Sequence, residues 1–340
     1  MQAPAIIKGR GAQIHTENKF ARHTYIKAHW EALDEEDLSL LDKTEYLEVF
    51  PKTIINEVKS EDLPLEYSLN PYQGCEHGCL YCYARDTHNY WGYNSGAEFE
   101  QKILVKLNAP LLLEQTFQKP NWQVKTIMLS GNTDCYQPAE RRYGITRKIL
   151  ELCLQYKHPV GIITKNSLIE RDLDILKALN ELNLVHVSIS ITTLNEDLRA
   201  VLEPRTVTAK RKLKTVEMLS NAGIPVHVMI APVIPGLNSH EVFDIAEAAH
   251  QAGAKSISHA VVRLNGSIGE VFTDWVNKVF PDRAEKVIHG IMELHGGKLN
   301  DSRPKIRMKG EGQTAEMIRQ MVQVAKQRFF TEPYELNLNT

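Results

Sequence analysis

The sequence lacks a long apolar run, a strong excess of charge of one sign and an even set of cysteines. No run of about 18 apolar residues occurs, so we expect no membrane-spanning helix and no membrane partner. The start of the chain has no long apolar stretch typical of a signal peptide, which predicts a cytoplasmic protein. Lys and Arg total 40 against 42 Asp and Glu, so the net charge of -2 gives no overall attraction to nucleic acid.

The 5 cysteines are too few and too unevenly placed for a disulfide framework. Three of them, Cys75, Cys79 and Cys82, stand in C-x3-C-x2-C spacing within the segment SLNPYQGCEHGCLYCYAR (68–85). This spacing suits three corners of a four-iron cluster, which leaves one iron open to a group that is not protein. Gly74 and Gly78 permit the left-handed turns that a loop needs to wrap such a cluster.

Zinc is the main alternative to iron as the metal that these cysteines could bind. A structural zinc ion usually takes four ligands arranged as separated pairs, and no second C-x2-C pair occurs in the sequence. His77 or His88 could supply a fourth ligand, although neither spacing is typical. Three ordinary buried cysteines are the remaining alternative, since free cysteine often packs as a small apolar residue.

The chain resembles the radical SAM superfamily, in which three cysteines have this spacing and an aromatic residue, here Tyr81, precedes the last. The segments 51–85 and LSGNTDCYQPAE (129–140) resemble the spore photoproduct lyase-related (DNA repair photolyase-like) branch of largely uncharacterised bacterial proteins. The resemblance covers roughly residues 50–265 and implies a [4Fe-4S] cluster that binds S-adenosyl-L-methionine (SAM). It further implies reductive cleavage of SAM to a 5'-deoxyadenosyl radical, with a reductase or a flavodoxin- or ferredoxin-type protein as electron donor.

Short apolar runs alternate with amphipathic stretches from residue 65 onward, which predicts repeated βα units and a parallel sheet. Six such units match the partial (β/α)6 TIM-like barrel that the resemblance implies. We predict an N-terminal arm over 1–50, polar and with an acidic patch at 34–37, a core over 51–265 and a C-terminal helical extension over 266–340. The expected strands are Tyr67–Asn70, Thr126–Ser130, Val160–Thr164, Val185–Ile191, Val226–Ile230 and Ser256–Arg263, and the expected C-terminal helices are Ile268–Val279, Arg283–Leu294 and Thr314–Phe330.

Polar residues follow the predicted strands, where the loops of a parallel βα fold converge on one mouth. Asn132, Thr133 and Asp134 follow the second strand and carry groups able to hold an amino group or ribose hydroxyls. In the superfamily this position contacts the methionyl amino group. Lys165 follows the third strand, where a cation could pair with the carboxylate of SAM.

Three later residues are candidates for contacts with SAM. Ser190 lies on the hydroxyl face of the fourth strand and could contact the ribose, or could simply fit a crowded barrel axis. Arg205, in the segment EPRT (203–206), resembles a family residue that helps to fix the SAM carboxylate, and a surface ion pair is the alternative. Ile234, in the turn APVIPGLN (231–238), is the best candidate for packing on adenine.

Cys135 is a candidate hydrogen-atom donor. Spore photoproduct lyase places its donor cysteine a few residues earlier in the motif, where this chain has Gly131, so the lyase activity does not follow from the resemblance. A chance small residue is the alternative for Cys135, since most structural cysteines are inert. Cys153 falls in a helical apolar pattern and is expected in the core.

The substrate is the least determined part of the hypothesis. Basic clusters at 210–214 and 303–309 and the aromatic segment 88–93 could contact a nucleic acid or nucleotide. Alternatively, the charges lie on a solvated helix face and the aromatics seal the cluster from water. We therefore expect a radical SAM enzyme of unknown substrate, and the competing hypothesis is a non-catalytic iron-sulfur or zinc protein for electron transfer or scaffolding.

Overall fold

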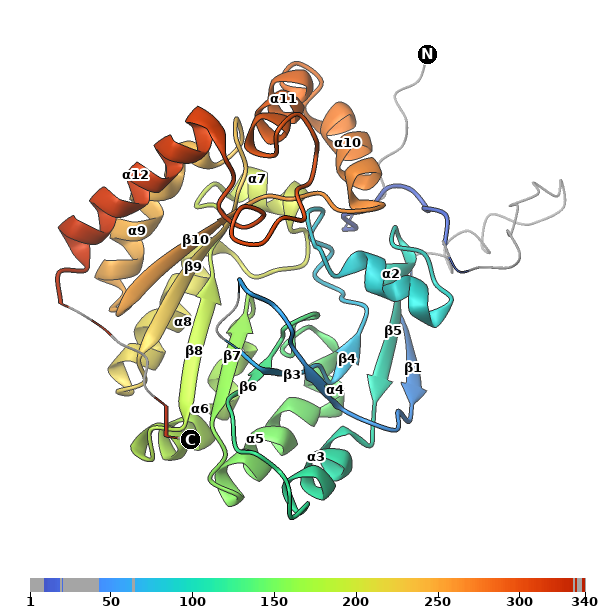
Figure 1. The fold of residues 1–340 in the computed structure, drawn as a ribbon, viewed down its shortest axis with the longest axis vertical. Coiled ribbons are helices and arrows are strands. Elements are labelled where there is room, and N and C mark those ends of the chain that lie inside the picture. The colour runs from blue at the N-terminus through green and yellow to red at the C-terminus, as the bar shows by residue number, and fades with distance from the viewer. Residues whose placement is uncertain are drawn as a thin grey trace, which may run out of the picture.

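A computed structural model describes residues 9–18, 20, 43–62, 65–332, 334 and 338–339. The predicted acidic patch at 34–37 lies outside these residues. Within the described part of the chain, a large sheet has the strand order β10-β9-β8-β7-β6-β3-β2 and forms an open, curved wall (Figure 1). All its neighbouring strands pair in parallel except the edge pair of β2 and β3, which is antiparallel. The strands are β2 (Ile55–Glu57), β3 (Tyr67–Leu69), β6 (Ile127–Leu129), β7 (Val160–Thr164), β8 (Val185–Ser190), β9 (Val226–Val233) and β10 (Ser256–Val261).

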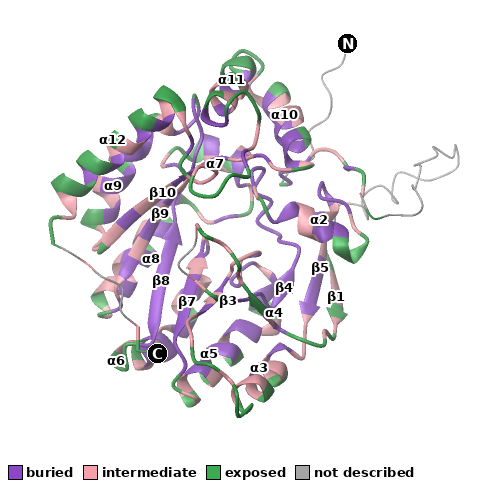
Figure 2. Ribbon diagram, in the orientation of Figure 1, coloured by how far each residue is buried: buried purple, intermediate pink, exposed green. Residues whose placement is uncertain are grey.

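The parallel strands β3, β6, β7, β8, β9 and β10 confirm the predicted open barrel, with bounds shifted by at most a few residues. Every residue of β8 is buried, because helices cover one face of the sheet and loops cover the other (Figure 2). The helices between strands are α3 (Ala109–Phe117), α4 (Ala139–Tyr143), α5 (Ile145–Gln155), α6 (Leu173–Glu181), α7 (Glu196–Leu202), α8 (Ala209–Asn221) and α9 (Val242–Gln251), with 3-10 turns η2 (Ser167–Asp172) and η3 (Ser239–Glu241).

The predicted C-terminal helices are present as α10 (Ile268–Val279), α11 (Ala284–Leu294) and α12 (Gly312–Phe329). Helix α12 packs against α9 and β10 and continues the outer helical layer (Figure 1). Helices α10 and α11 instead pack over the cysteine loop, since Phe272, Val287 and Ile291 share an apolar cluster with Cys79 and Leu80. The extension therefore supports the loop that carries the cysteines.

A second, small sheet with the order β1-β5-β4 was not predicted. It consists of β1 (Glu45–Val49), β4 (Tyr72–Gln73) and β5 (Lys102–Lys106), and the short helices η1 (Arg85–Trp91) and α2 (Glu98–Gln101) lie between β4 and β5. Strand β1 falls within the predicted arm and pairs in parallel with β5. The segment between β4 and β5 contains the cysteine loop, so the loop is anchored to the small sheet at both ends, and β4 follows shortly after β3 of the large sheet.

The loop after β9 is held in place by the side chain of Asn238. The spacing of Asn238 and Glu241 resembles a helix capping box, but the side chain of Asn238 does not cap the helix. Its Nδ2 donates to the carbonyl oxygens of Thr192, at 2.6 Å, and Pro232, at 2.9 Å, and its Oδ1 accepts from Ile234 N. Asn238 therefore ties the end of β9 to the end of β8, next to the mouth of the barrel.

Candidate active site

A cavity of about 320 Å³ opens at the carboxyl ends of the parallel strands. Cys75, Cys79 and Cys82 all contribute to its lining. Of the other residues selected from the sequence, Tyr81, Asn132, Thr133, Asp134, Lys165 and Ser190 also line it, whereas Cys135, Arg205 and Ile234 do not. The fold thus brings the cysteine triplet together with the polar ends of β6, β7 and β8.

The cysteine loop takes its shape from two glycines and from a backbone hydrogen bond to helix α2. Gly74 and Gly78 adopt φ values of 79° and 69°, as the sequence predicts. A Cβ at Gly78 would lie 2.8 Å from Glu100 Oε2, so both the backbone angle and the space require glycine. The backbone N–H of Cys75 donates to the carbonyl oxygen of Phe99 at 2.9 Å. The first cysteine is therefore fixed to α2.

A buried ion pair holds the loop from behind. Arg85 Nη2 lies 2.6 Å from Glu100 Oε1, and both side chains are completely buried. Arg85 also donates from Nε to the carbonyl oxygen of Cys79 at 3.0 Å. The same carboxylate accepts the backbone N–H groups of Gly11, at 2.9 Å, and Ala12, at 2.7 Å. An N-terminal segment far away in sequence is therefore part of the cysteine site.

The three cysteines fit a cluster better than a single metal ion. All three are free thiols, and burial is the largest cause of the raised pKa of each one. Bound iron would displace the thiol protons and neutralise the thiolate charge. No three His, Cys, Asp or Glu side chains in the described ranges are placed to hold one metal ion. Zinc needs its ligands around one atom, whereas a four-iron cube binds each thiolate at a different iron.

The two histidines considered as zinc ligands have other surroundings. His77 Nδ1 lies 3.4 Å from Asp134 Oδ2, and His77 Nε2 lies 3.2 Å from Asn166 Nδ2. Burial lowers the pKa of His77 to about 4, so the ring is neutral. His88 does not line the cavity; its ring packs against Tyr93 and Phe99. His88 is therefore a packing residue, whereas Tyr90 and Trp91 of the same segment are exposed.

The polar residues after β6 are held in place by hydrogen bonds. Asp134 accepts from Thr164 Oγ1 at 2.8 Å and from Lys165 N at 2.8 Å, which joins the ends of β6 and β7. The Nδ2 of Asn132 donates to Thr87 Oγ1 at 3.1 Å. Thr133 Oγ1 donates to the carbonyl oxygen of Tyr72 at 2.6 Å. These side chains line the cavity in fixed orientations.

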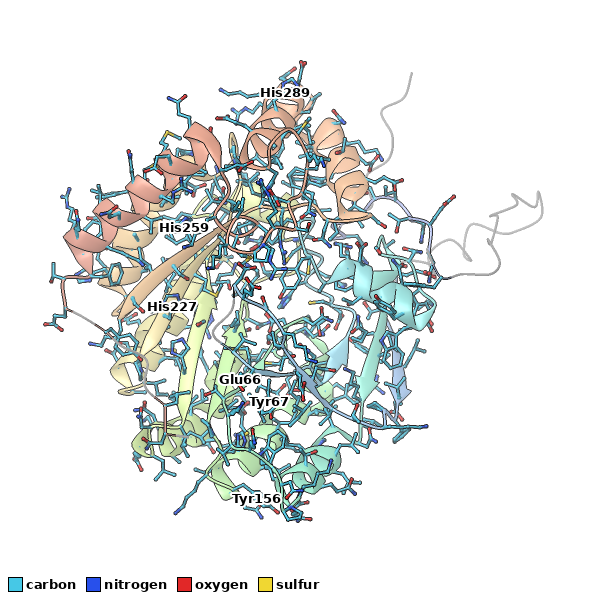
Figure 3. All side chains as sticks on the ribbon, in the orientation of Figure 1. Glu66, Tyr67, Tyr156, His227, His259 and His289 are labelled. Carbon is cyan, nitrogen blue, oxygen red and sulfur yellow. The ribbon has the colours of Figure 1, made fainter. Side chains whose placement is uncertain are left out.

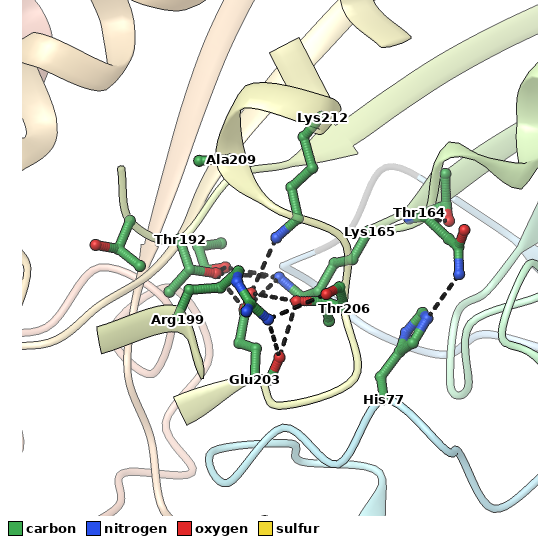
Figure 4. Close-up of polar contacts among 12 residues, drawn as sticks. His77, Thr164, Lys165, Thr192, Arg199, Glu203, Thr206, Ala209 and Lys212 are labelled. Carbon is green, nitrogen blue, oxygen red and sulfur yellow. Dashed lines mark hydrogen bonds and ion pairs between the residues drawn. The ribbon is translucent and has the colours of Figure 1, made fainter. Parts of the chain in front are cut away.

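Glu203 lies at the centre of a buried network that the sequence did not reveal (Figure 4). Its Oε1 lies 3.2 Å from Lys165 Nζ, and its Oε2 lies 2.9 Å from Lys212 Nζ. The hydroxyl groups of Tyr81 and Thr192 also donate to Glu203 Oε1. Burial, followed by the charge of Lys212, lowers the pKa of Lys165 to about 8. Lys165 lines the cavity, and Lys212 does not.

The other SAM-contact candidates have different positions. Ser190 lies in the cavity wall, as expected for the inner face of β8. Arg205 lies 3.5 Å from Glu76 Oε2 and is partly exposed, so it matches the ion-pair alternative. Ile234 is fully buried in the cluster under α10 and α11, and the last part of β9 lines the cavity with Ala231 and Pro232 instead. In the segment EPRT (203–206), the charged side chain that is buried is that of Glu203, not that of Arg205.

Cys135 lies outside the cavity. It is fully buried in the main core, its N–H donates to Ser130 Oγ at 2.8 Å, and its carbonyl oxygen accepts from Thr146 at 2.6 Å. The geometry therefore favours a structural residue over a hydrogen-atom donor. Cys153 is buried in the same core, as expected.

The two basic clusters are interrupted by ion pairs. Lys212 is buried against Glu203, and Arg211 pairs with Glu170, so the first cluster is not a continuous solvated face. In the second cluster, Arg303 pairs with Asp301 at 2.5 Å. Much of the positive charge that could contact phosphates on the surface is thus already neutralised by neighbouring carboxylates.

The inner face of the sheet below the cavity is also polar. His227, on β9, faces the same side as Met229 in the cavity wall (Figure 3). Its two ring nitrogens lie 2.7 Å from the hydroxyl oxygens of Ser256 and Ser258 on β10. Its ring centroid lies 6.0 Å from that of His186 on β8. These polar groups have no counterpart among the residues selected from the sequence.

Other proteins resemble this chain in sequence, and solved structures resemble it in fold. The family model described as Radical SAM superfamily matches residues 69–249. An uncharacterised protein of Mycobacterium tuberculosis is 34% identical over 238 residues, which cover 69% of this chain and 70% of the relative. An uncharacterised protein of Methanocaldococcus jannaschii is 28% identical, with 57% of this chain and 70% of the relative covered. A structure of spore photoproduct lyase complexed with dinucleoside spore photoproduct superposes with a TM-score of 0.62 at 14% identity, over 90% of this chain and 85% of that one.

Among the described residues, no helix combines the length and the apolar character needed to cross a membrane.

Proposed function

Because this chain belongs to the radical SAM superfamily, we propose that it is an enzyme that binds a [4Fe-4S] cluster and cleaves SAM reductively to a 5'-deoxyadenosyl radical. The observation that carries the proposal is the shared cavity lining of Cys75, Cys79, Cys82 and Lys165. A reduced cluster in this position would supply the electron that breaks the sulfonium bond of SAM. A reductase, flavodoxin or ferredoxin would supply the electron to the cluster.

The chain's own residues would hold the two cofactors. Cys75, Cys79 and Cys82 would each bind one iron, which leaves the fourth iron open to SAM. Lys165 shares Glu203 with Lys212, so two cations face one carboxylate. The carboxylate group of SAM would balance the second positive charge, and that balance favours Lys165 as its partner.

The remaining contacts would orient SAM and exclude water. Thr133 and Asp134 lie in the cavity wall after β6, where they can face the methionyl amino group. Ser190 can face the ribose from β8. Tyr81 packs its ring 5.6 Å from Lys165 Nζ and donates its hydroxyl to Glu203, which holds the loop residue before Cys82 against the lysine.

Anaerobic reconstitution with iron and sulfide tests the proposal. We expect about four irons and four sulfides per chain, and 5'-deoxyadenosine should form when SAM and dithionite are added. Cys82→Ser should lose most of the iron and all SAM cleavage. Cys153→Ala, which changes a buried cysteine outside the cavity, should keep both. A colourless protein that binds only zinc would refute the proposal.

The competing function is that of a non-catalytic iron-sulfur protein. It predicts the same iron content but no binding of SAM, so equilibrium dialysis of the reconstituted protein against SAM separates the two. The arrangement of Lys165, Asp134 and Ser190 around one cavity with the cysteines favours the enzyme, since electron transfer alone requires no polar pocket beside the cluster.

A further inference from the structure

Arg263 is a cation in the cavity wall without a hydrogen-bonding partner. It follows β10, and its guanidinium carbon lies 5.4 Å from the centroid of the Tyr83 ring. Among the residues that the structure describes, no acceptor forms a hydrogen bond or an ion pair with this guanidinium. Arginine stays protonated in proteins. The charge of Arg263 is repelled by that of Arg307 and attracted by the carboxylate of Asp62, but Asp62 already pairs with Arg307, so the two arginines share one carboxylate.

The other cations of the cavity already have partners. Lys165 pairs with Glu203, and Arg307 pairs with Asp62 and donates to Ser60 Oγ at 2.7 Å. Among the cations of the described lining, Arg263 is therefore the one without a hydrogen-bonded carboxylate.

The carboxylates near the cavity already have hydrogen-bonding partners, and Asp62, the one that attracts Arg263, pairs with Arg307. Asp134 is the one carboxylate in the described lining. Its oxygens accept hydrogen bonds from Tyr136 N, Thr164 Oγ1 and Lys165 N. A partly buried, unpaired cation is unfavourable until an anion joins it, so the cavity favours a ligand that carries one.

Tyr83 places this cation beside the cysteines. Tyr83 directly follows Cys82, and its hydroxyl donates to the carbonyl oxygen of Gly131 at 2.7 Å. About 45% of the Tyr83 surface is accessible, and Tyr83 is one of the residues that line the cavity. A group bound to Arg263 would therefore sit one side chain away from the cluster loop.

Much of the remaining cavity lining is apolar. Met128, Ile163, Met229, Val261 and Met308 contribute side chains without charge. Such walls suit the body of an organic ligand, while the guanidinium fork suits a planar or tetrahedral oxyanion.

We propose that Arg263, stacked on Tyr83, binds an oxyanion group of the substrate, a phosphate or a carboxylate, and so holds an otherwise apolar part of the substrate beside the cluster loop. This inference rests on the proposed radical SAM function for the meaning of the site, since it assigns the second occupant of the same cavity.

Equilibrium dialysis of the reconstituted, SAM-loaded protein tests the proposal with two probes, inorganic phosphate and acetate, at constant ionic strength. We expect saturable binding of at least one probe. Arg263→Gln should weaken that binding about tenfold or more, because a hydrogen-bonded charge pair is worth about 1.5–3 kcal/mol. Arg263→Lys should retain part of it. Arg283→Gln, at an exposed arginine on the C-terminal extension, should bind as the wild type does.

The preference between the probes identifies the oxyanion. Tighter binding of phosphate assigns a phosphorylated substrate, and tighter binding of acetate assigns a carboxylate. Equal binding by Arg263→Gln and the wild type would overturn the proposal. It is also overturned if the probes bind only when SAM is absent, since the carboxylate of SAM would then occupy Arg263.

Two controls keep the result interpretable. Thermal unfolding of Arg263→Gln without probe reports whether the variant folds, and Arg263→Lys tests the site if it does not. Formation of 5'-deoxyadenosine by the wild type without substrate is measured in parallel. Its absence would count against the proposed function, while anion binding, which needs no electron transfer, would still decide the role of Arg263.

Discussion

Glu100 and Arg85 form a completely buried ion pair, with 2.6 Å between Oε1 and Nη2, directly behind the cysteine loop. The same carboxylate accepts two backbone N–H groups from Gly11 and Ala12. One side chain therefore connects the N-terminal segment, helix α2 and the loop that carries Cys79.

Replacing Glu100 by Gln should destabilise the protein and weaken cluster retention. The substitution leaves the Arg85 guanidinium buried without a counter-charge, which costs about 3–5 kcal/mol. Urea unfolding and the iron content after desalting measure the two effects. Glu48→Gln, at an exposed position on β1, is the matched control and should change neither. A Glu100→Gln variant as stable as the wild type would show that the ion pair contributes little.

Replacing Gly11 by Ala should displace the N-terminal segment from the cysteine loop. The added Cβ would lie 1.8 Å from the carbonyl oxygen of Gly78, so one backbone must move. We expect faster loss of iron in air, measured by the decay of cluster absorbance, because water reaches the loop more easily. An unchanged decay rate would mean that the segment 9–12 does not shield the cluster.

Lys165 and Lys212 should differ in their effect on SAM. Both contact Glu203, but Lys165 alone of the two lines the cavity. Lys165→Met should weaken SAM binding about tenfold or more, as expected for the loss of a charged hydrogen bond. Lys212→Met should lower the free energy of unfolding with little change in SAM affinity. Equal affinities in the two variants would exclude Lys165 as the partner of the SAM carboxylate.

Cys135→Ala should leave the iron content and the formation of 5'-deoxyadenosine unchanged, because Cys135 is buried in the core outside the cavity. The substitution removes one sulfur atom from a packed site, so a modest loss of stability is expected. Once a substrate is known, loss of product with normal SAM cleavage would instead assign Cys135 as a hydrogen donor.

Stability should fall in mild acid because of buried histidines such as His227. Burial, together with the nearby charges of His186 and Lys326, lowers the pKa of His227 to about 4. An unfolded histidine titrates near 6.5. Between about pH 6.5 and 4 the unfolded chain therefore binds a proton that the folded chain does not, and the free energy of unfolding decreases as the pH falls.

His227→Gln should reduce this slope by up to about 1.4 kcal/mol per pH unit, the contribution of one proton. Chemical denaturation at several pH values measures it. The control is His289→Gln, at the exposed surface of α11 (Figure 3), which should keep the wild-type slope. A slope unchanged in His227→Gln would mean that His227 is protonated in the folded protein as readily as in the unfolded chain.

The parallel strands could be predicted because each is a short apolar run bounded by polar residues. Strand β7 was predicted with its exact bounds, Val160–Thr164. The small sheet could not be predicted, since β4 is only Tyr72–Gln73 and β1 lies in a polar segment without periodicity. Its strands are defined by their pairing partners rather than by local pattern.

The candidate site likewise contains some residues that the sequence indicates and others that it does not. The cysteines, Lys165 and Asp134 are placed by spacing and by strand ends, and these signals are local. Glu100 and Glu203 are charged residues in polar stretches of the sequence, so nothing in the sequence indicates that both are fully buried. Arg263 could have been selected by the rule that selected Lys165, a cation just after an apolar strand.

The N-terminal contacts of Glu100 also bear on where this protein can be cut. The matched family region begins at residue 69, but the carboxylate behind the cysteine loop takes two of its donors from Gly11 and Ala12. Strand β5, which follows α2, pairs with β1, also upstream of residue 69. A fragment designed on the boundaries of sequence similarity would therefore contain every cysteine of the triplet and still lack part of the wall that keeps them in place.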